Sequence, residues 1–181
     1  MPLVISFFII ISEIVCLVIT FQRERFRMFR YYTILSNAVT LLSTALLVPV
    51  GATSFAAALR LLSVCMMTMT FLVVVFVLVP MTKDVKGMLF HGTELFYHTV
   101  NPILTVVSYV LWEAHSRAWL LPVGVTVFYG LLMMYLNYIK VADGPYPFLK
   151  VHDQTRTATV LWIVVLFGLI GVIAWAYTRL A

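Results

Sequence analysis

Charged residues are scarce in this sequence. Only 10% of the 181 residues are Asp, Glu, Lys or Arg, whereas 63% are hydrophobic, and the mean hydropathy is +1.05. A soluble domain has about 25% charged and about 45–50% apolar residues, so the composition excludes an ordinary soluble domain and predicts an integral membrane protein. No basic region or small-residue cleavage site precedes Glu13, so we expect the first apolar run to be a retained span and not a signal peptide.

Cysteine is nearly absent, and so are the common cofactor motifs. Cys16 and Cys65 lie in separate apolar runs and form no CxxC pair, which argues against a disulfide framework or a zinc site. The sequence has no Gly-rich phosphate loop, GxSxG elbow, HExxH pair or dinucleotide fingerprint. We therefore expect no cofactor and no bound metal.

A metal site is the weaker alternative. Five residues with metal-binding side chains could share one face of the membrane: His91, Glu94, His98, His152 and Asp153. Their spacing differs from the HExxH pattern, which sets two ligands one helical turn apart.

Six apolar runs approach or exceed the length of about 20 residues that a helix needs to cross a bilayer. They are residues 3–21, 31–50, 57–80, 96–112, 118–138 and 157–177. No soluble domain fits between or beyond these runs. The sequence thus predicts an all-α fold, a single integral membrane bundle of six transmembrane helices that occupies residues 1–181.

The charges that are present are mostly basic, and they predict an orientation. The net charge is +5, and nine of the twelve Lys and Arg residues lie in the loops 22–30, 81–95 and 139–156. The other three are Arg60, Arg117 and Arg179. Because the bases flank apolar spans, they indicate contact with a membrane surface and not with nucleic acid. The positive-inside rule places the three loops in the cytoplasm, in a multipass protein of the inner (plasma) membrane.

Two apolar runs carry one-sided polar stripes. The second run contains Thr33, Ser36, Asn37, Thr40 and Thr44, and the fourth contains His98, Asn101, Thr105 and Ser108. This spacing sets each group on one helix face. Hydrogen bonding between membrane helices is the simpler interpretation of most of these residues. Glu13, inside the first run, is expected to face the bundle as a structural, catalytic or proton-binding group.

Thr33 and His98 stand out because each begins its run. The second and fourth runs enter from the same membrane face, so the two side chains lie at similar shallow depth and can meet if the helices are neighbours. An imidazole can activate a hydroxyl for acyl transfer, and this depth suits a lipid near its head group. Glu94, four residues before His98, could fix the imidazole tautomer.

Three motifs in sequence resemble one protein family. They are Tyr32-Thr33-Ile34-Leu35-Ser36-Asn37, His98-Thr99-Val100-Asn101-Pro102 and Tyr146-Pro147-Phe148-Leu149. With the spacing of the spans, they make the chain similar to the androgen-induced proteins, which include the androgen-dependent regulators of tissue factor pathway inhibitor and small bacterial six-span relatives. The resemblance covers nearly the whole chain, and the flanking sequence is closest to the bacterial branch.

The resemblance implies a function. Characterised members of that family are membrane threonine hydrolases that cleave fatty acid esters of hydroxy fatty acids. By this resemblance Thr33 is the nucleophile, His98 is the base and a lipid ester is the substrate, with long-chain specificity from Met- and Phe-rich walls in the third and fifth runs. The further candidates are Ser36, Asn37 or Asn101 as oxyanion or substrate-polar donors, Glu94 or Glu13 as carboxylates that orient His98, and Tyr146 and Phe148 as a cap over the site.

Two other classes of protein stay open from the residues alone. The first is a non-enzymatic multipass protein that binds lipid or transports a small molecule, in which Thr33 and His98 are packing and ligand contacts. The second, which has less support, is a proton-coupled transporter that uses Glu13 and His98.

Overall fold

A computed structural model describes residues 2–51 and 53–180 of the chain. Every regular element over these residues is helical, and they contain no strand. The all-α fold predicted from the sequence is therefore confirmed for this part of the chain.

Five helical stretches are long and apolar enough to cross a membrane. They are α1 (Leu3–Glu24) with the 3₁₀ segment η1 (Arg25–Arg30); α2 (Tyr32–Val50); α3 (Ser54–Val73) with η2 (Val74–Leu78) and α4 (Val79–Thr82); α8 (Leu120–Tyr138); and α9 (Arg156–Thr178). These stretches coincide with five of the six runs predicted to span, as an integral membrane protein requires.

The predicted span at 96–112 is not among these five stretches. Its residues belong to a segmented helix made of α6 (Gly92–Leu95), the π-helical turn η3 (Phe96–Val100) and α7 (Asn101–Trp112), which has only 12 residues. Pro102 lacks a backbone donor, and its ring presses on the carbonyl four residues earlier. The wider π turn accommodates this proline. The polar residues His98, Asn101, Thr105 and Ser108 lower the hydropathy of the stretch, so it is not among those apolar enough by composition to cross a membrane.

A second π turn has the same relation to a proline. η2 ends two residues before Pro80 in α4, as η3 ends two residues before Pro102 in α7. π turns are rare and are frequent at functional sites. Both turns here border the candidate site described below.

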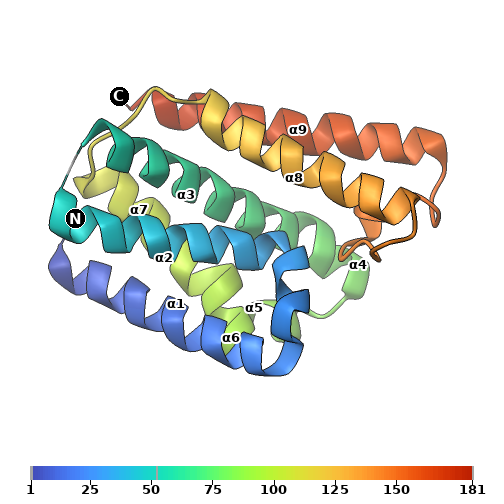
Figure 1. Ribbon diagram of the computed structural model, residues 1–181, viewed down its shortest axis with the longest axis horizontal. Coiled ribbons are helices and arrows are strands. Elements are labelled where there is room, and N and C mark those ends of the chain that lie inside the picture. The colour runs from blue at the N-terminus through green and yellow to red at the C-terminus, as the bar shows by residue number, and fades with distance from the viewer. Residues whose placement is uncertain (1, 52, 181) are drawn as a thin grey trace.

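The helices form a bundle around α3, which is the most buried of the five long stretches. α3 packs against α2, α7, α8 and α9, while α1 packs against α2 and α7. Figure 1 shows α8 and α9 side by side along one edge, with α1 along the opposite edge. At one end of the bundle lie η1, α4 and the loop before α9, and both chain termini lie at the other end (Figure 1).

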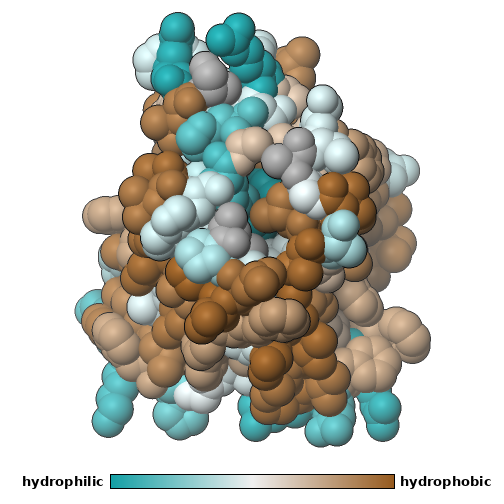
Figure 2. Space-filling view, turned by 90° about the vertical axis from the view of Figure 1, so that its left-hand side faces the viewer, coloured by the Kyte–Doolittle hydropathy of each residue, from teal (hydrophilic) through white to brown (hydrophobic). Residues whose placement is uncertain are grey.

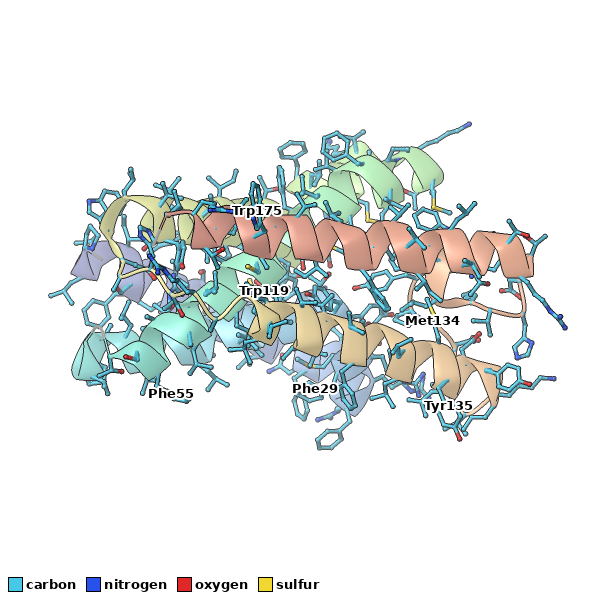
Figure 3. The ribbon with its side chains drawn as sticks, turned by 90° about the horizontal axis from the view of Figure 1, so that it is seen from above. Phe29, Phe55, Trp119, Met134, Tyr135 and Trp175 are labelled. Atoms are coloured by element: carbon cyan, nitrogen blue, oxygen red, sulfur yellow. The ribbon has the colours of Figure 1, made fainter. Side chains whose placement is uncertain are left out.

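The outer surface of the bundle is apolar. Phe29, Phe55 and Trp175 project away from the helices (Figure 3) and are exposed, whereas Met134 is buried. Seen from the end that bears the termini, hydrophobic residues cover the flanks, and hydrophilic ones gather at the centre and edges (Figure 2). An apolar surface of this extent is suited to lipid contact and not to water.

Inside the bundle, hydroxyl groups join neighbouring helices. Ser36 Oγ lies 3.0 Å from Thr70 Oγ1, and Thr40 Oγ1 lies 2.8 Å from Ser63 Oγ, which ties α2 to α3 at two levels. Such bonds are worth about 0.6 kcal/mol each in membrane helices. Ser36 and Thr40 thus have the packing role that is the simpler interpretation of the stripe.

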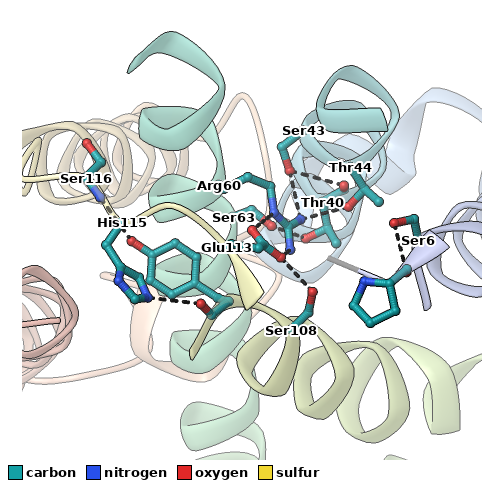
Figure 4. A network of polar contacts seen from close by, with 12 residues as sticks. Ser6, Thr40, Ser43, Thr44, Arg60, Ser63, Ser108, Glu113, His115 and Ser116 are labelled. Atoms are coloured by element: carbon teal, nitrogen blue, oxygen red, sulfur yellow. Dashed lines mark hydrogen bonds and ion pairs between the residues drawn. The ribbon is translucent and has the colours of Figure 1, made fainter. Parts of the chain in front are cut away.

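A buried ion pair and its hydroxyl partners join α2, α3 and α7 (Figure 4). Arg60, which the charge count placed near a membrane surface, is fully buried in α3 and forms two bonds to Glu113, of 2.6 and 2.7 Å. Arg60 Nη1 also donates to Thr44 Oγ1 of α2 (2.8 Å), and Ser108 of α7 donates to Glu113 Oε1 (2.7 Å). Every charged atom of the pair that faces the interior thus has a partner.

Candidate active site

Thr33 lies in the first turn of α2, where backbone N–H groups have no partner within the helix. Tyr31 is in an extended conformation and gives the helix no side-chain cap. The free N–H of Thr33 instead donates to the Tyr146 hydroxyl, 3.3 Å away. The start of α2 therefore faces a site formed by distant parts of the chain.

The structure brings Thr33 and His98 together. Thr33 Oγ1 lies 3.4 Å from His98 Nε2, and both side chains are buried, with 8% and 6% exposed. The separation is long for a hydrogen bond, as is common for catalytic pairs without substrate. η3 carries His98 and packs against both α1 and α2, which is how the two residues predicted to share a membrane depth also share a site.

A backbone carbonyl fixes the tautomer of His98. Its Nδ1 lies 2.7 Å from the carbonyl oxygen of Met88 in α5 (Val85–Phe90). A carbonyl can only accept, so Nδ1 carries the proton, and Nε2 of the neutral ring is an acceptor directed at Thr33. Glu94 Oε2 is 3.2 Å from the same Nδ1, and its side chain is 44% exposed. The predicted contact of Glu94 with His98 is present, but the Met88 carbonyl is the closer partner.

Tyr146 reaches Thr33 from the loop before α9. Its hydroxyl lies 3.3 Å from Thr33 Oγ1. Burial raises the pKa of the Tyr146 phenol above its usual value, although hydrogen bonds with Thr33 lower it in part. The group is therefore a neutral phenol near neutral pH and can donate a hydrogen bond.

The loop that carries Tyr146 is rigidly held. Gly144 packs so closely on the Leu149 backbone that an added Cβ would lie 2.9 Å from its carbonyl carbon. The Tyr146 ring stacks on Phe148, with centroids 5.2 Å apart, in the 3₁₀ turn η4 (Pro147–Leu149). Val151 N–H donates to Asn137 Oδ1 of α8 at 2.8 Å. These contacts fix the position of the Tyr146 hydroxyl.

Two pockets meet at Thr33. The larger has about 510 Å³ of open space and a partly polar lining that includes Glu24, Asp84 and His98. The smaller is narrow, about 50 Å³, and almost wholly apolar; it is lined by Met69, Val73, Leu78, Gly130, Met134, Phe148, Leu166 and Phe167, among others. Thr33, Leu78 and Tyr146 line both. Thr33 thus lies between a partly polar cavity and an apolar crevice formed by α3, α8 and α9.

The predicted oxyanion donors on α2 do not point at the Thr33 hydroxyl. Ser36 Oγ and Asn37 Nδ2 both donate to the backbone carbonyl of Thr33, at 2.8 and 2.7 Å. Asn101 lies fully buried against α1, where its Oδ1 accepts a hydrogen bond from Ser12 (2.9 Å). Ser36 and Asn37 thus bond the backbone of their own helix, Asn101 bonds α1, and none of the three is directed at the Thr33 hydroxyl.

The remaining candidate residues, Glu13 and Phe148, lie in different parts of the bundle. Glu13 follows Ser12, is fully buried, and has no hydrogen bond partner among the residues that the structure describes. It lies near Asn101 and not at Nδ1 of His98, where Met88 and Glu94 are found. Phe148 supports the Tyr146 ring and lines the apolar pocket.

Over the described ranges, no three His, Cys, Asp or Glu side chains gather to hold a metal ion. The chain matches no protein-family model, no curated protein and no solved structure. What the fold and site define is therefore a class: an all-helical protein with helices long and apolar enough to span a membrane and a buried Thr–His pair at one end of the bundle. The likeness to the androgen-induced proteins stays a prediction from the three motifs.

Proposed function

We propose that this protein is a membrane-embedded esterase that hydrolyses lipid esters through a Thr33 nucleophile and a His98 base. The observation that supports it most is the directed order of hydrogen bonds, from Thr33 Oγ1 to His98 Nε2 and from His98 Nδ1 to the Met88 carbonyl. A nucleophile, a base and a group that orients the base are the parts that acyl transfer needs. Fatty acid esters of hydroxy fatty acids are the substrates that the family resemblance suggests.

The reaction follows from these groups. His98 Nε2 takes the Thr33 hydroxyl proton as Oγ1 bonds to the ester carbonyl carbon, and His98 then gives this proton to the departing alkoxide to release the alcohol. The product of this half is an acyl ester on Thr33. Water then attacks the acyl carbon while His98 takes its proton, and return of that proton to Oγ1 releases the fatty acid and restores the site.

The two pockets at Thr33 support a lipid ester as the substrate. The apolar lining of the smaller pocket suits an acyl chain, because a chain withdrawn from water gains about 0.8 kcal/mol for each CH₂ that it buries. At about 50 Å³ the pocket holds the start of such a chain, and the lining side chains must move apart to admit more of it. The larger, partly polar pocket suits the alcohol portion of the ester. With this orientation, the ester carbonyl comes to the hydroxyl where the pockets join.

We also propose six membrane crossings. Residues 92–112 are continuously helical through α6, η3 and α7, and such a stretch is about 31 Å long at about 1.5 Å per residue, enough for the hydrocarbon core of about 30 Å. The site then lies near the membrane face formed by loops 22–30, 81–95 and 139–156, which the positive-inside rule assigns to the cytoplasm.

A direct test uses the full chain purified in detergent. A fluorophosphonate probe should label the protein, and mass spectrometry should locate the adduct on Thr33. Branched fatty acid esters of hydroxy fatty acids, offered in mixed micelles, should be hydrolysed to free fatty acid. A protein that binds these esters but neither turns them over nor reacts with the probe would instead be a lipid-binding or transport protein.

Gly130 offers a test of the acyl crevice. A Cβ at this position would lie 2.9 Å from Phe167 Cε1, so Gly130→Ala should displace the ring within the crevice that both residues line. We expect kcat/KM to fall about 10-fold for palmitate esters relative to butyrate esters of the same alcohol, since a single methyl group can change pocket specificity by that factor.

The matched control for this change is Gly124→Ala on the same helix. A Cβ there meets no atom within 4 Å, so the ratio of palmitate to butyrate turnover should stay at the wild-type value. An unchanged ratio in Gly130→Ala as well would show that the acyl chain binds elsewhere.

Glu94 should matter little to turnover. The Met88 carbonyl is 2.7 Å from His98 Nδ1, whereas the partly exposed Glu94 carboxylate is 3.2 Å away. We expect Glu94→Gln to lower kcat by less than about 10-fold. By comparison, neutralising a buried carboxylate that orients a catalytic histidine lowers kcat by roughly 10⁴-fold. A loss near 10⁴-fold in steady-state kinetics would instead assign the orienting role to Glu94.

A further inference from the structure

Neither the packing of its loop nor a role as a cap over the site explains the position of the Tyr146 hydroxyl. It lies 3.3 Å from Thr33 Oγ1 and 3.3 Å from the Thr33 backbone nitrogen. One phenol thus contacts both the nucleophilic oxygen and the first turn of a 19-residue helix.

The direction of its hydrogen bond follows from the His98 tautomer. Because the Met88 carbonyl accepts from Nδ1, the neutral ring has only an acceptor at Nε2, and the Thr33 hydroxyl must donate to it. The single proton of the Thr33 hydroxyl is then engaged, so Oγ1 can only accept any further hydrogen bond. Tyr146 therefore donates its proton toward Oγ1, the atom that attacks the ester.

A donor at this position is needed in the proposed reaction. When Oγ1 bonds to the carbonyl carbon, the carbonyl oxygen becomes an oxyanion held one carbon away from Oγ1. Hydrogen bond donors within about 2.7–3.1 Å of that oxyanion lower the barrier. A hydroxyl 3.3 Å from Oγ1 is within reach of this new oxygen, and the helix N-terminus adds a favourable electrostatic field for a negative charge.

The donors predicted from the sequence do not fill this role. Ser36 and Asn37 donate to the Thr33 carbonyl, and Asn101 is buried against α1. Among the described residues, this leaves the Tyr146 hydroxyl and the Thr33 N–H beside the nucleophile.

We propose that Tyr146 is a catalytic residue, whose hydroxyl, together with the backbone N–H of Thr33, forms the oxyanion hole of the ester hydrolase. This role rests on the proposed function. In the free protein the phenol oxygen accepts from the Thr33 N–H. When substrate is bound, that N–H and the Tyr146 O–H both turn to the carbonyl oxygen as it gains charge.

The test is Tyr146→Phe in the full chain in detergent, with a lipid ester as substrate. Phenylalanine keeps the stacking on Phe148 and removes only the hydroxyl. We expect kcat to fall about 10²-fold, the usual loss for one oxyanion donor, with KM within about threefold of wild type. Tyr135→Phe is the matched control, because that tyrosine is exposed on α8 and lines neither pocket at Thr33; its kinetics should be those of wild type.

A second readout separates catalysis from a merely structural contact. A long-chain trifluoromethyl ketone forms a tetrahedral oxyanion adduct on the nucleophile, whereas the corresponding alkyl ether binds without forming one. Tyr146→Phe should weaken the ketone by the same factor as kcat/KM and leave the ether unchanged. Equal losses for both ligands, or an unchanged kcat, would overturn the oxyanion role and leave Tyr146 as a cap of α2.

A further substitution keeps the proposal testable if the phenylalanine variant does not fold. Incorporation of 3-fluorotyrosine at position 146 keeps the ring and makes its hydroxyl a stronger donor. Turnover should then rise or hold at neutral pH, while a severalfold fall would contradict the role. A wild-type protein that is neither labelled by a fluorophosphonate nor active on any lipid ester would overturn the esterase function itself. An active wild type with an equally active Tyr146→Phe variant would overturn only the oxyanion role of Tyr146.

Discussion

Thr33→Val should abolish ester hydrolysis, with a fall in kcat of about 10⁴-fold or more, while the protein stays folded. Valine keeps the branched shape and the restricted rotamer of threonine, so the first turn of α2 keeps its packing. The substitution removes only the hydroxyl that lies 3.4 Å from His98 Nε2 and 3.3 Å from Tyr146. Fluorophosphonate labelling should disappear together with turnover.

Two variants on the same helix make this result specific. Thr33→Ser restores a hydroxyl on a smaller side chain and should recover labelling and most of the turnover. Thr40→Val removes a fully buried hydroxyl of the same polar stripe, one that bonds Ser63 and not the site, and should leave kcat near wild type. Turnover in Thr33→Val equal to that in Thr40→Val would exclude Thr33 as the nucleophile.

His98→Gln should have nearly the same effect as loss of the nucleophile. The amide cannot accept and return a proton at neutral pH, and residues that act as one catalytic unit show losses that do not add. The double variant with Thr33→Val should therefore be no slower than either single variant. A double variant much slower than both would show that Thr33 and His98 act in separate steps.

The long helices were predictable because hydropathy over about 20 residues reports directly on the cost of exposing a segment to lipid or to water. The stretch around His98 is the exception, because His98, Asn101, Thr105 and Ser108 lower its hydropathy below that of the other runs. Its backbone geometry was not predictable either. Pro102 changes the hydrogen bonding of the turn before it and gives η3 its π form. A count of apolar residues cannot register that change, although the proline itself was a visible signal.

The pairing of Thr33 with His98 was accessible from topology, because two helices that enter from one membrane face bring their first residues to the same depth. The orienting group was not accessible. Met88 acts through its backbone carbonyl, which every residue possesses, so no side-chain pattern marks it. The sequence predicts Tyr146 only as a cap, since it gives no direction for the hydroxyl. The three donors predicted instead bond elsewhere: Ser36 and Asn37 to the Thr33 carbonyl, and Asn101 to α1.

The sequence carries a signal for the ion pair between Arg60 and Glu113. The start of the third apolar run and the end of the fourth lie on one side of a six-span topology, with opposite charges at similar depth. A single charge near a span end is readily taken as a surface anchor, which is how Arg60 was counted. Its burial depends on Thr44 and Ser108 as well, which satisfy the atoms that water would otherwise bind.

Loss of either member of this pair should have the largest effect on stability of any single substitution proposed here. Arg60→Leu leaves the Glu113 carboxylate buried without its cation, with Ser108 as a donor, and Glu113→Leu leaves the guanidinium with Thr44 and Ser43. Removing one partner of a buried ion pair costs about 3–5 kcal/mol because the other charge stays desolvated. Reversible unfolding in mixed micelles should show a loss of this size for each variant.

The double variant Arg60→Leu with Glu113→Leu separates the value of the pair from the cost of an unpaired charge. With both charges gone, apolar side chains of similar volume occupy the space between α2, α3 and α7, and such replacements are often neutral or stabilising. We therefore expect the double variant to be more stable than either single one, with a coupling energy of about 2 kcal/mol or more in the double-mutant cycle. Losses that simply add would mean that each residue is held by its hydroxyl partners and not by the other. Arg60 lies near the start of α3 and Glu113 follows the end of α7, whereas Thr33 lies at the start of α2, at the other end of the bundle (Figure 1). The folded double variant should therefore retain the wild-type kcat on lipid esters. That result would separate the groups that hold the bundle together from those that carry the reaction.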